Sequence, residues 1–445
     1  MTPTLEISRF AADLEYARLP VGLQRKLGEL LLDYCRVASI GERQPWSAWA
    51  REYASQTAGP GTAPVMFSGN QLNPVSSAFL NTVYAGSIDA DDVHVGAMLH
   101  PGCIVFPAAL AIGASRNKSG AEVMSAVAAG YEAMIRVALS IQPSHFARGF
   151  QSTSTCGVFG ASIAAARLLF DGAQRSGRIA ESIGIAASFS GGLTQFYHSE
   201  TTVKRLHAAQ AASSGVHAAL LVEAGFSGPT DILEGRDGFA RAYADKVDFS
   251  VISHDLGTIF RTDEVAVKPH ACSARVQSAI EAASSLCMRH DVDPAMICRI
   301  TLGIPAVIQG RLTAANPKDL QAAQMSAPFS LALAICKGRT SGFSLGIDDF
   351  EAGLGEPRVI YLSGLVRCVV DDEVERTSST ESVSARVTLT LESGESYSVL
   401  VLAPLGSASR PYKFEDHLTR ARNELCRRYS PEATDRLLEE SQRFA

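Results

Sequence analysis

Residues 121–139 read AEVMSAVAAGYEAMIRVAL, and apolar residues recur there at intervals of three and four. This spacing predicts an α-helix with one buried face, because side chains three and four positions apart are neighbours on a helix. Residues 208–225, AAQAASSGVHAALLVEAG, show the same pattern and are rich in Ala, Gly and Ser, so helices can approach closely. Gly225 follows the last apolar turn and predicts the end of that helix. The chain up to about residue 245 is expected to be almost wholly helical.

The pattern changes near residue 265, where segments with strand character begin. Residues 297–308, ICRITLGIPAVI, have the composition of a strand. Residues 384–404 alternate apolar and polar positions on both sides of ESGES, which predicts a hairpin. Helical patterns lie at 273–290, 323–338 and 414–444. Residues 266–402 therefore predict an α+β module, and periodicity alone leaves open whether the last helices pack back on the first part.

Length and composition restrict the class of protein. A chain of 445 residues is too long for one simple core and predicts two domains. The net charge of -6, without a run of Lys or Arg, argues against nucleic acid as a partner. The 9 cysteines are scattered and form no CxxC pair, which is typical of reduced thiols in a cytoplasmic protein. The N-terminal residues lack the apolar core of a signal peptide, and no membrane span is expected.

The first candidate site is residues 88–102, IDADDVHVGAMLHPG. The aspartates and histidines here allow a metal site, a metal-free acid/base site, or a polar loop that caps the helix entered at Pro101. No HExxH, EF-hand or Cys/His pattern supports a metal. Spacing alone favours the capped loop over either kind of site.

Three further stretches carry groups that suit an anionic ligand. Residues 149–169 place a run of hydroxyls before a helix, which favours a bound anion or ordinary capping. Lys204 and His207 share a helix face, which is either a cation site or a solvated helix start. Lys268 and His270 stand at the change from helical to α+β character, which is either a site between domains or a hinge.

Taken together, these stretches offer acids, bases and cations without a cofactor motif. The sequence has no Rossmann glycine pattern, P-loop, Ser-His triad signature or pyridoxal phosphate signature. The combination suits cofactor-free removal of a proton from carbon beside a carboxylate. Such a carbon acid is weak and needs a placed base and cations over the developing charge.

The stretches, in their order, resemble the MmgE/PrpD family, which includes 2-methylcitrate dehydratase, cis-aconitate decarboxylase and iminodisuccinate epimerase. Residues 79–113 resemble its block of an asparagine, an Asp-x-Asp-Asp run and a His-Pro-Gly. Residues 149–169 are similar to its Gly-Phe-His-x-Thr block. The blocks around Lys204 and Lys268 and the Ala-Gln-x-Ser block of residues 316–338 follow in the family's order. The resemblance covers nearly the whole chain.

The resemblance implies a mainly α fold, with a large all-helical domain built from both chain ends and a smaller α+β lid domain. The expected bounds are 1–265 with 403–445 for the helical domain and 266–402 for the lid. It also implies an active site between the domains, a homodimer, and core chemistry that needs no metal and no organic cofactor.

The resemblance also implies the site residues. The implied catalytic residues are Asp89, His100, Lys204 and Lys268. The implied substrate-binding residues are Asp92, Gln151, His207, His270 and Phe329. Asp89 and His100 form the expected acid/base pair, and which of them is the base is open. The two lysines are expected to hold carboxylates of the substrate.

Four residues depart from the family pattern. Val93 and Phe329 stand where a hydroxyl is common, and Gly86 and Gln151 stand where the family commonly has a histidine. Changes of this kind in a polar site alter discrimination by large factors. We therefore expect a substrate other than 2-methylcitrate or cis-aconitate.

The sequence thus predicts a cofactor-independent lyase, of the hydro-lyase type, acting on a small di- or tricarboxylate. An epimerase or other isomerase, or a decarboxylase, is the alternative, because all three reactions share a carbanion-like intermediate. A non-catalytic ligand-binding or scaffold homologue is the alternative of another class.

Overall fold

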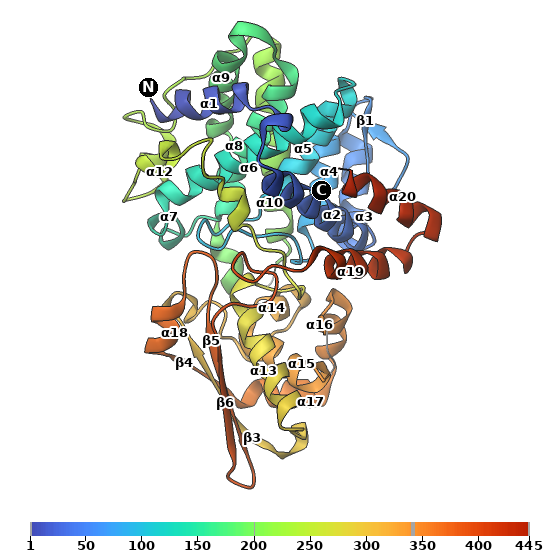
Figure 1. Ribbon diagram of the computed structural model, residues 1–445, viewed down its shortest axis with the longest axis vertical. Coiled ribbons are helices and arrows are strands. Elements are labelled where there is room, and N and C mark those ends of the chain that lie inside the picture. Colours follow the sequence, from blue (N-terminus) through green and yellow to red (C-terminus); the bar gives the residue numbers. More distant parts are fainter. Residues whose placement is uncertain (1, 200, 340–342, 444–445) are drawn as a thin grey trace.

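The computed structural model describes residues 2–199, 201–339 and 343–443. Helices make up the upper part of the molecule, where both ends of the chain lie, and the lower part combines helices with a sheet (Figure 1). The prediction of a mainly α protein is confirmed. The helices of the upper part are α1 (Pro3–Asp13), α2 (Val21–Gly41), α3 (Pro45–Thr57), α4 (Pro74–Gly86), α5 (Gly102–Ser115), α6 (Gly120–Ile141), α7 (Ser144–Ala147), α8 (Ser152–Leu169), α9 (Arg175–Ser188), α10 (Lys204–Glu223), α11 (Phe239–Tyr243), α12 (Ser250–Ser253), α19 (Phe414–Cys426) and α20 (Pro431–Gln442). The helices of the lower part are α13 (Gln277–Arg289), α14 (Leu320–Gln324), α15 (Ala327–Lys337), α16 (Ile347–Gly353), α17 (Pro357–Leu365) and α18 (Asp372–Thr377).

The sheet of the lower part has the strand order β4-β3-β5-β6. Its strands are β3 (Ile297–Ile304), β4 (Val366–Val370), β5 (Ala385–Leu391) and β6 (Ser396–Val401). Strands β3 and β4 are parallel, and the other pairs are antiparallel. Alternate residues of β5, including Val387 and Leu389, are buried, and α13 packs on β5 and β6. A short antiparallel pair, β1 (Ala63–Pro64) and β2 (Gln71–Leu72), belongs to the upper part.

Helices α6, α8 and α10 pack closely at the centre of the upper part. A Cβ at Gly130 of α6 would lie 2.7 Å from the carbonyl oxygen of Gly160 in α8, and one at Gly215 of α10 would lie 2.5 Å from Cβ of Ala161. Only glycine permits these contacts, which explains the small residues of the sequence pattern. Helix α6 is long and apolar enough to cross a membrane, but 94% of its most apolar window is buried inside the protein.

Most of the predicted elements are present, with differences at their ends. Gly225 follows α10 with φ of +108°, and the amide of the next residue donates to the Leu221 carbonyl, as in a Schellman cap. The predicted hairpin is β5–β6. The predicted strand 297–308 was too long, because Pro305 has no amide proton for the ladder and a 3-10 turn follows. Strand β4 was missed, since five residues directly after a helix give little period-two signal.

The helical pattern over 323–338 corresponds to two separate helices rather than one. Helix α14 ends at Gln324 and α15 begins at Ala327, where the Ser326 hydroxyl accepts a hydrogen bond from the Phe329 amide. The pattern over 414–444 divides into α19 and α20, and its last residue lies outside the described residues. Each break coincides with a serine cap followed by proline, which starts a new helix.

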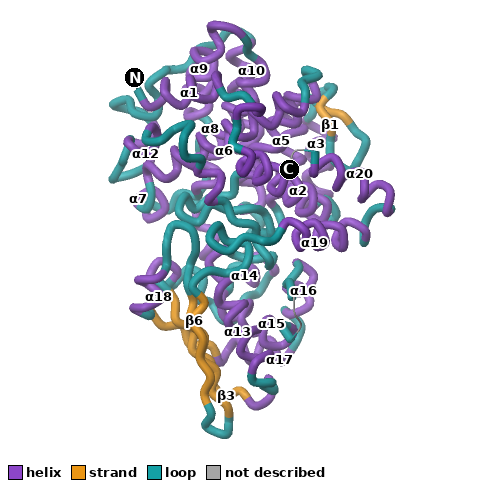
Figure 2. The backbone as a smooth tube through the Cα atoms, viewed as in Figure 1, coloured by secondary structure: helices purple, strands orange, loops and turns teal. Residues whose placement is uncertain are grey.

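Two large buried apolar clusters share no residue. One includes residues from Ile7 to Val267, and the other includes residues from Cys272 to Leu389. Helices α19 and α20 pack on α2, where a small cluster includes Leu32 and Leu425. Loops fill the junction between the two parts (Figure 2). The exact domain bounds stay a prediction.

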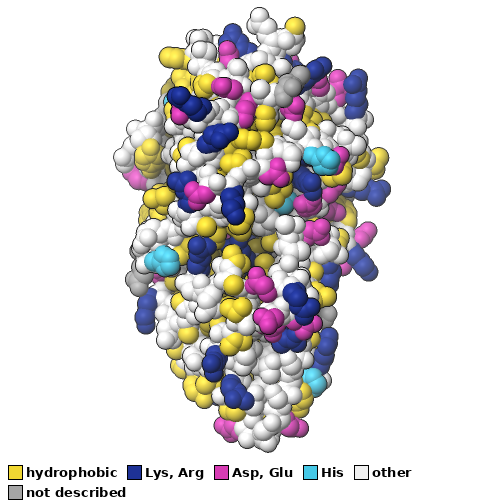
Figure 3. Space-filling view, turned by 90° about the vertical axis from the view of Figure 1, so that its left-hand side faces the viewer, with side chains coloured by type: hydrophobic (Ala, Val, Ile, Leu, Met, Phe, Trp, Pro, Cys, Tyr) yellow, Lys and Arg dark blue, Asp and Glu magenta, His cyan; other side chains and the backbone are white. Residues whose placement is uncertain are grey.

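On the face seen in Figure 3, charged side chains of both signs are mixed without a large patch of one sign.

Arg36 of α2 links the C-terminal helices to the loop that carries the first candidate site. Its side chain is 1% exposed and lies 2.8 Å from Asp33 Oδ1 and 2.9 Å from Glu424 Oε2 of α19. It also donates to the carbonyl oxygen of Ala90, at 3.2 Å. A buried cation with three acceptors holds its neighbours in fixed positions, because an unpaired partner would be costly to bury. Arg36 therefore positions the loop that begins at Ile88.

We predict that Arg36→Met lowers the free energy of unfolding by about 3–5 kcal/mol, because Asp33 and Glu424 would lose their buried counter-ion. Urea unfolding measures the change. The control is Arg236→Met, since that side chain is 91% exposed and its pairing with Asp237 should contribute little. Equal stability of the two variants would contradict the role of Arg36.

Candidate active site

A cavity lies at the junction, lined by residues of both parts of the molecule. Asp89, His100, Gln151 and Lys204, which the sequence predicts as site residues, line it. The loops before α5 and the starts of α8 and α10 supply these four residues. The cavity measures about 70 Å³, which is room for roughly five water molecules, or about 150 Å³ of liquid. A small organic acid is a ligand of this size.

Asp89 is the centre of the site's charges. Its Oδ2 lies 2.6 Å from Nζ of Lys204, and its Oδ1 lies 2.7 Å from Nζ of Lys268, which also donates to the Asp89 carbonyl oxygen. The side chains of Asp89 and Lys268 are almost fully buried. Asp89 has φ of +57°, in the left-handed region that costs a non-glycine residue some conformational energy. Three predicted residues from distant parts of the chain thus meet in one ion cluster.

Asp89 is fixed as a carboxylate. Burial raises its pKa, but Lys204 and Lys268 outweigh that effect and hold the pKa well below its usual range. Lys268 is affected in the opposite direction: burial lowers its pKa, and the charges of Asp89 and Asp91 raise it above the ordinary value. A carboxylate held by two ammonium groups is a weak base, so Asp89 is suited to positioning the lysines rather than to taking a proton.

His100, in contrast to Asp89, is suited to accept a proton. Its Nδ1 lies 2.9 Å from the Asp92 carbonyl oxygen and 3.4 Å from Asp91 Oδ2. A carbonyl oxygen can only accept, so Nδ1 carries the proton and Nε2 holds a lone pair. Burial is the largest influence on the pKa of His100 and lowers it overall. The imidazole is therefore neutral near pH 7, with no hydrogen bond to Nε2 from any described residue, and it lines the cavity.

Asp92, predicted to bind substrate, does not line this cavity. Its Oδ1 accepts from the amide of Gly102, the first residue of α5, at 2.9 Å, and its Oδ2 accepts from the Tyr131 hydroxyl at 2.8 Å. Burial raises the pKa of Asp92 to about 7, although both hydrogen bonds lower it. Asp92 thus caps the helix that follows Pro101 and orients the backbone carbonyl that holds His100.

Two helix starts face the cavity. Gln151 precedes α8, and its Oε1 accepts from the Ser154 amide at 2.7 Å. Lys204 is the first residue of α10, whose N-terminus has no side-chain cap. The partial positive charge at both helix N-termini adds to the charge of Lys204 and favours a carboxylate in the cavity.

The remaining predicted residues lie away from the cavity lining. His207 is buried beside Phe196, its Nδ1 has no partner among the described residues, and burial lowers its pKa to about 4. His270 accepts from the Leu345 amide through Nδ1, and burial lowers its pKa to about 3. Phe329 is 1% exposed and packs in the lower core against Phe350. In this conformation these three side chains support neighbouring structure, and their predicted contact with substrate has no geometric support.

Sequence reasoning missed Phe146, Tyr197 and Arg275, which also line the cavity. They come from α7, from the 3-10 helix η3 (Thr194–His198) and from the 3-10 helix η5 (Ala274–Val276). Short helices and turns of this kind carry no periodic signal. The one available clue was that Arg275 stands seven residues after Lys268, inside a stretch already singled out.

Comparison with known proteins assigns the chain to a family. Residues 5–252 match the model of the MmgE/PrpD N-terminal domain, and residues 270–444 match that of the MmgE/PrpD C-terminal domain. The chain belongs to the MmgE/PrpD family. The resemblance seen in the ordered sequence blocks is therefore confirmed.

Three relatives that match this chain carry cis-aconitate decarboxylase in their names. Cis-aconitate decarboxylase of Aspergillus terreus is 26% identical over 429 residues, which is 91% of this chain and 85% of the relative. A cis-aconitate decarboxylase-like protein of Aspergillus oryzae is 25% identical over 427 residues, with 91% and 86% covered. Human cis-aconitate decarboxylase is 29% identical over 250 residues, with 53% and 50% covered.

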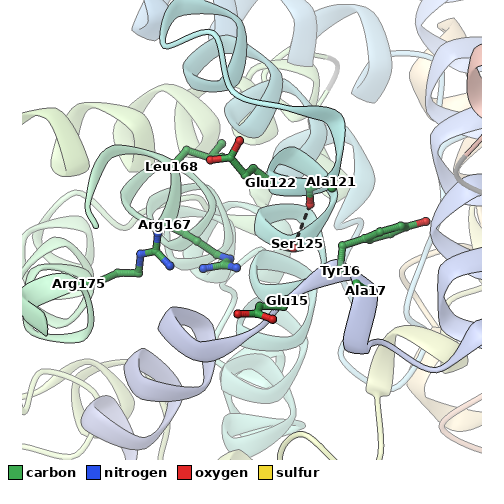
Figure 4. A pocket seen from close by; sticks show the side chains of 9 residues that line it. All are labelled: Glu15, Tyr16, Ala17, Ala121, Glu122, Ser125, Arg167, Leu168 and Arg175. Carbon is green, nitrogen blue, oxygen red and sulfur yellow. Dashed lines mark hydrogen bonds between the residues drawn. The ribbon is translucent and has the colours of Figure 1, made fainter. Parts of the chain in front are cut away.

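Another cavity of this MmgE/PrpD protein is larger, about 300 Å³, but has different chemistry. Figure 4 shows it between η1 (Tyr16–Arg18), α6 and α8, with the side chains of Arg167 and Arg175 on one side. Both guanidinium groups donate to the Ala12 carbonyl oxygen near the end of α1, so they serve as caps there. No histidine lines this cavity, so it lacks a base suited to neutral pH.

Among the described residues, no group of three or more His, Cys, Asp or Glu side chains is placed to hold a metal ion.

The raised pKa of Asp92 predicts a pH effect on stability. Between pH 3.8 and about 7 the folded protein keeps a proton on Asp92 that the unfolded chain has lost, so raising the pH lowers the free energy of unfolding. The difference in that free energy between wild type and Asp92→Asn should therefore fall across this range and level off above it. Urea unfolding at a series of pH values measures it.

The matched control is Asp237→Asn, because Asp237 is 81% exposed and its substitution should change the free energy of unfolding little. A wild-type minus Asp92→Asn difference that rises with pH would contradict the assignment of a buried, protonated Asp92.

Proposed function

We propose that this protein is a cofactor-independent lyase that acts on a small di- or tricarboxylate. It removes a proton from carbon next to a carboxylate and then eliminates water. The observation that carries the proposal is the lone pair of His100 Nε2 in a cavity that also contains Lys204. A neutral imidazole is the general base best matched to neutral pH, and the ammonium group supplies the charge that the product of proton removal needs.

Proton removal places negative charge on the substrate carboxylate, as an enediolate. Lys204 and the start of α10 lie where they can bind that carboxylate, and they bind the enediolate more strongly because it carries more charge. Lys268 is almost fully buried behind Asp89 and adds positive potential without lining the cavity. Asp89 holds both lysines in place and keeps Lys268 charged.

Elimination requires a proton for the departing hydroxyl group. Tyr197 lines the same cavity, and its hydroxyl has no hydrogen bond to any described residue. Burial raises the pKa of Tyr197, so it is protonated at neutral pH. As the carbon–oxygen bond breaks, the hydroxyl takes the Tyr197 proton and leaves as water, while His100 keeps the proton from carbon. Transfer of that proton back to the tyrosinate restores both groups.

Decarboxylation is the second candidate, because the curated relatives are named as cis-aconitate decarboxylases. In that reaction the bond to the carboxylate breaks first, and the carbanion must then receive a proton. Tyr197 is able to give that proton, but decarboxylation leaves the neutral His100 without a role as a base, which is why we rank elimination first. Epimerisation needs removal of the proton and delivery of a proton to the opposite face of the same carbon, and the non-catalytic alternative needs only binding.

The test is proton exchange in deuterated water with citrate, cis-aconitate and aspartate as probes, followed by NMR. We predict exchange at carbon beside a carboxylate with at least one probe, and a loss of about 10²–10⁴-fold in His100→Ala. The control is His254→Ala, because this histidine is 73% exposed and does not line the cavity.

The products separate the alternatives. Loss of water supports the hydro-lyase, loss of carbon dioxide supports the decarboxylase, and inversion alone supports the epimerase. If one or more probes raise the melting temperature but none of the probes shows exchange or product, that result would contradict the enzyme and support the binding protein.

A homodimer, which the family resemblance implies, is also proposed for this protein. Light scattering of the purified chain at micromolar concentration should give twice the monomer mass of 47.2 kDa. A mass equal to that of one chain would contradict it.

A further inference from the structure

Arg275 brings a second cation into the cavity from the lower part of the molecule. It lies on η5, just before α13, whereas Lys204 belongs to α10 of the upper part. Both side chains line the cavity. Arg275 is half-buried, and its guanidinium group makes no hydrogen bond or ion pair with any described residue. An arginine with five free donors in a partly dry site is unusual, because those donors normally find acceptors.

An aromatic ring holds this arginine in place. The guanidinium carbon of Arg275 lies 5.1 Å from the ring centre of Phe146, and that of Arg311 lies 4.3 Å from the same centre. Cation–π contacts stabilise a guanidinium group without using its hydrogen-bond donors. The two arginines are therefore positioned, but their donors stay available to a ligand.

The charge in this region is not balanced within the protein. Arg311 also lacks a carboxylate partner among the described residues, whereas Arg386 of the lower part pairs with Asp371 and Glu373. Asp89 is already held between two lysines. Burial lowers the pKa of Arg275, with Tyr197 opposing and Arg311 adding to this effect, which indicates a charge that lacks solvation. A protein with net charge -6 thus keeps unpaired positive charge at one cavity.

We propose that Arg275, held on Phe146 beside Arg311, is a specificity residue that binds a second carboxylate of the substrate. The inference rests on the proposed function and narrows it: the ligand carries one carboxylate at Lys204 and another at Arg275. Its two ends then contact the upper and the lower part of the molecule. A guanidinium group can form two parallel hydrogen bonds to a carboxylate. A monocarboxylic acid of equal length that is bound at Lys204 has no carboxylate at its other end, so it cannot form these bonds with Arg275.

The test compares succinate with butyrate, which has the same carbon chain but one carboxylate. Dissociation constants are measured by NMR titration of the intact protein. In wild type, succinate should bind at least 10-fold more tightly than butyrate. In Arg275→Gln, succinate should weaken by about 10- to 100-fold, because a charge-assisted contact is lost, while butyrate should change little. Arg275→Lys should fall between wild type and Arg275→Gln for succinate.

The control is Arg289→Gln, an exposed arginine of α13 that does not line the cavity, and it should bind both acids as wild type does. Urea unfolding of Arg275→Gln checks that the protein still folds. Equal weakening of succinate and butyrate, or no change in either, would overturn the role of Arg275.

These outcomes are distinct from failure of the proposed function. If wild type exchanges protons with carboxylate probes but Arg275→Gln discriminates succinate from butyrate as strongly as wild type does, the proposed function stands and this inference fails. If wild type binds neither acid and exchanges no probe, both fail.

Discussion

The Asp89 carboxylate, buried between the ammonium groups of Lys204 and Lys268, is the interaction on which the site depends. Two cations and one anion removed from water are tolerated only together, since removal of one partner leaves a buried charge unpaired. The lysines lie 115 and 179 residues further along the chain than Asp89. The cluster can therefore form only when α10 and the start of the lower part are both in place around the loop at residue 88. Gln324 strengthens that link, because its side chain donates to the carbonyl oxygens of Ile88 and Ala271.

This arrangement separates the roles of two groups that the sequence left as an undivided acid/base pair. The lysines keep Asp89 ionised and occupy its oxygens, so it cannot easily accept a proton. The Asp92 carbonyl oxygen and Asp91 hold Nδ1 of His100 and leave Nε2 exposed to the cavity. The same short loop thus provides both a fixed anion and a neutral base, and the difference arises from which atoms surround each side chain.

Much of the fold could be predicted from local sequence patterns. The period of three and four in residues 121–139 predicts α6, and the alternation about ESGES predicts the β5–β6 hairpin. Strand β4 could not be predicted, because its place beside β3 is set by a long crossover connection rather than by its own sequence. In the site, sequence motifs predicted four residues: Asp89, His100, Lys204 and Lys268. The motifs did not predict Tyr197 or Arg275, because each lies on a short 3-10 helix whose position only the tertiary contacts define.

The sequence by itself determined the family, the mainly helical class and the types of group available for chemistry, because these follow from periodicity and from residues in a recognisable order. Only the tertiary structure decided which of those groups share a cavity. Asp92, His207, His270 and Phe329 stand in the same motifs as the cavity residues, yet backbone direction and packing turn them into caps and core. Burial, tautomer and counter-ion are properties of a three-dimensional neighbourhood, and spacing along a chain does not contain them.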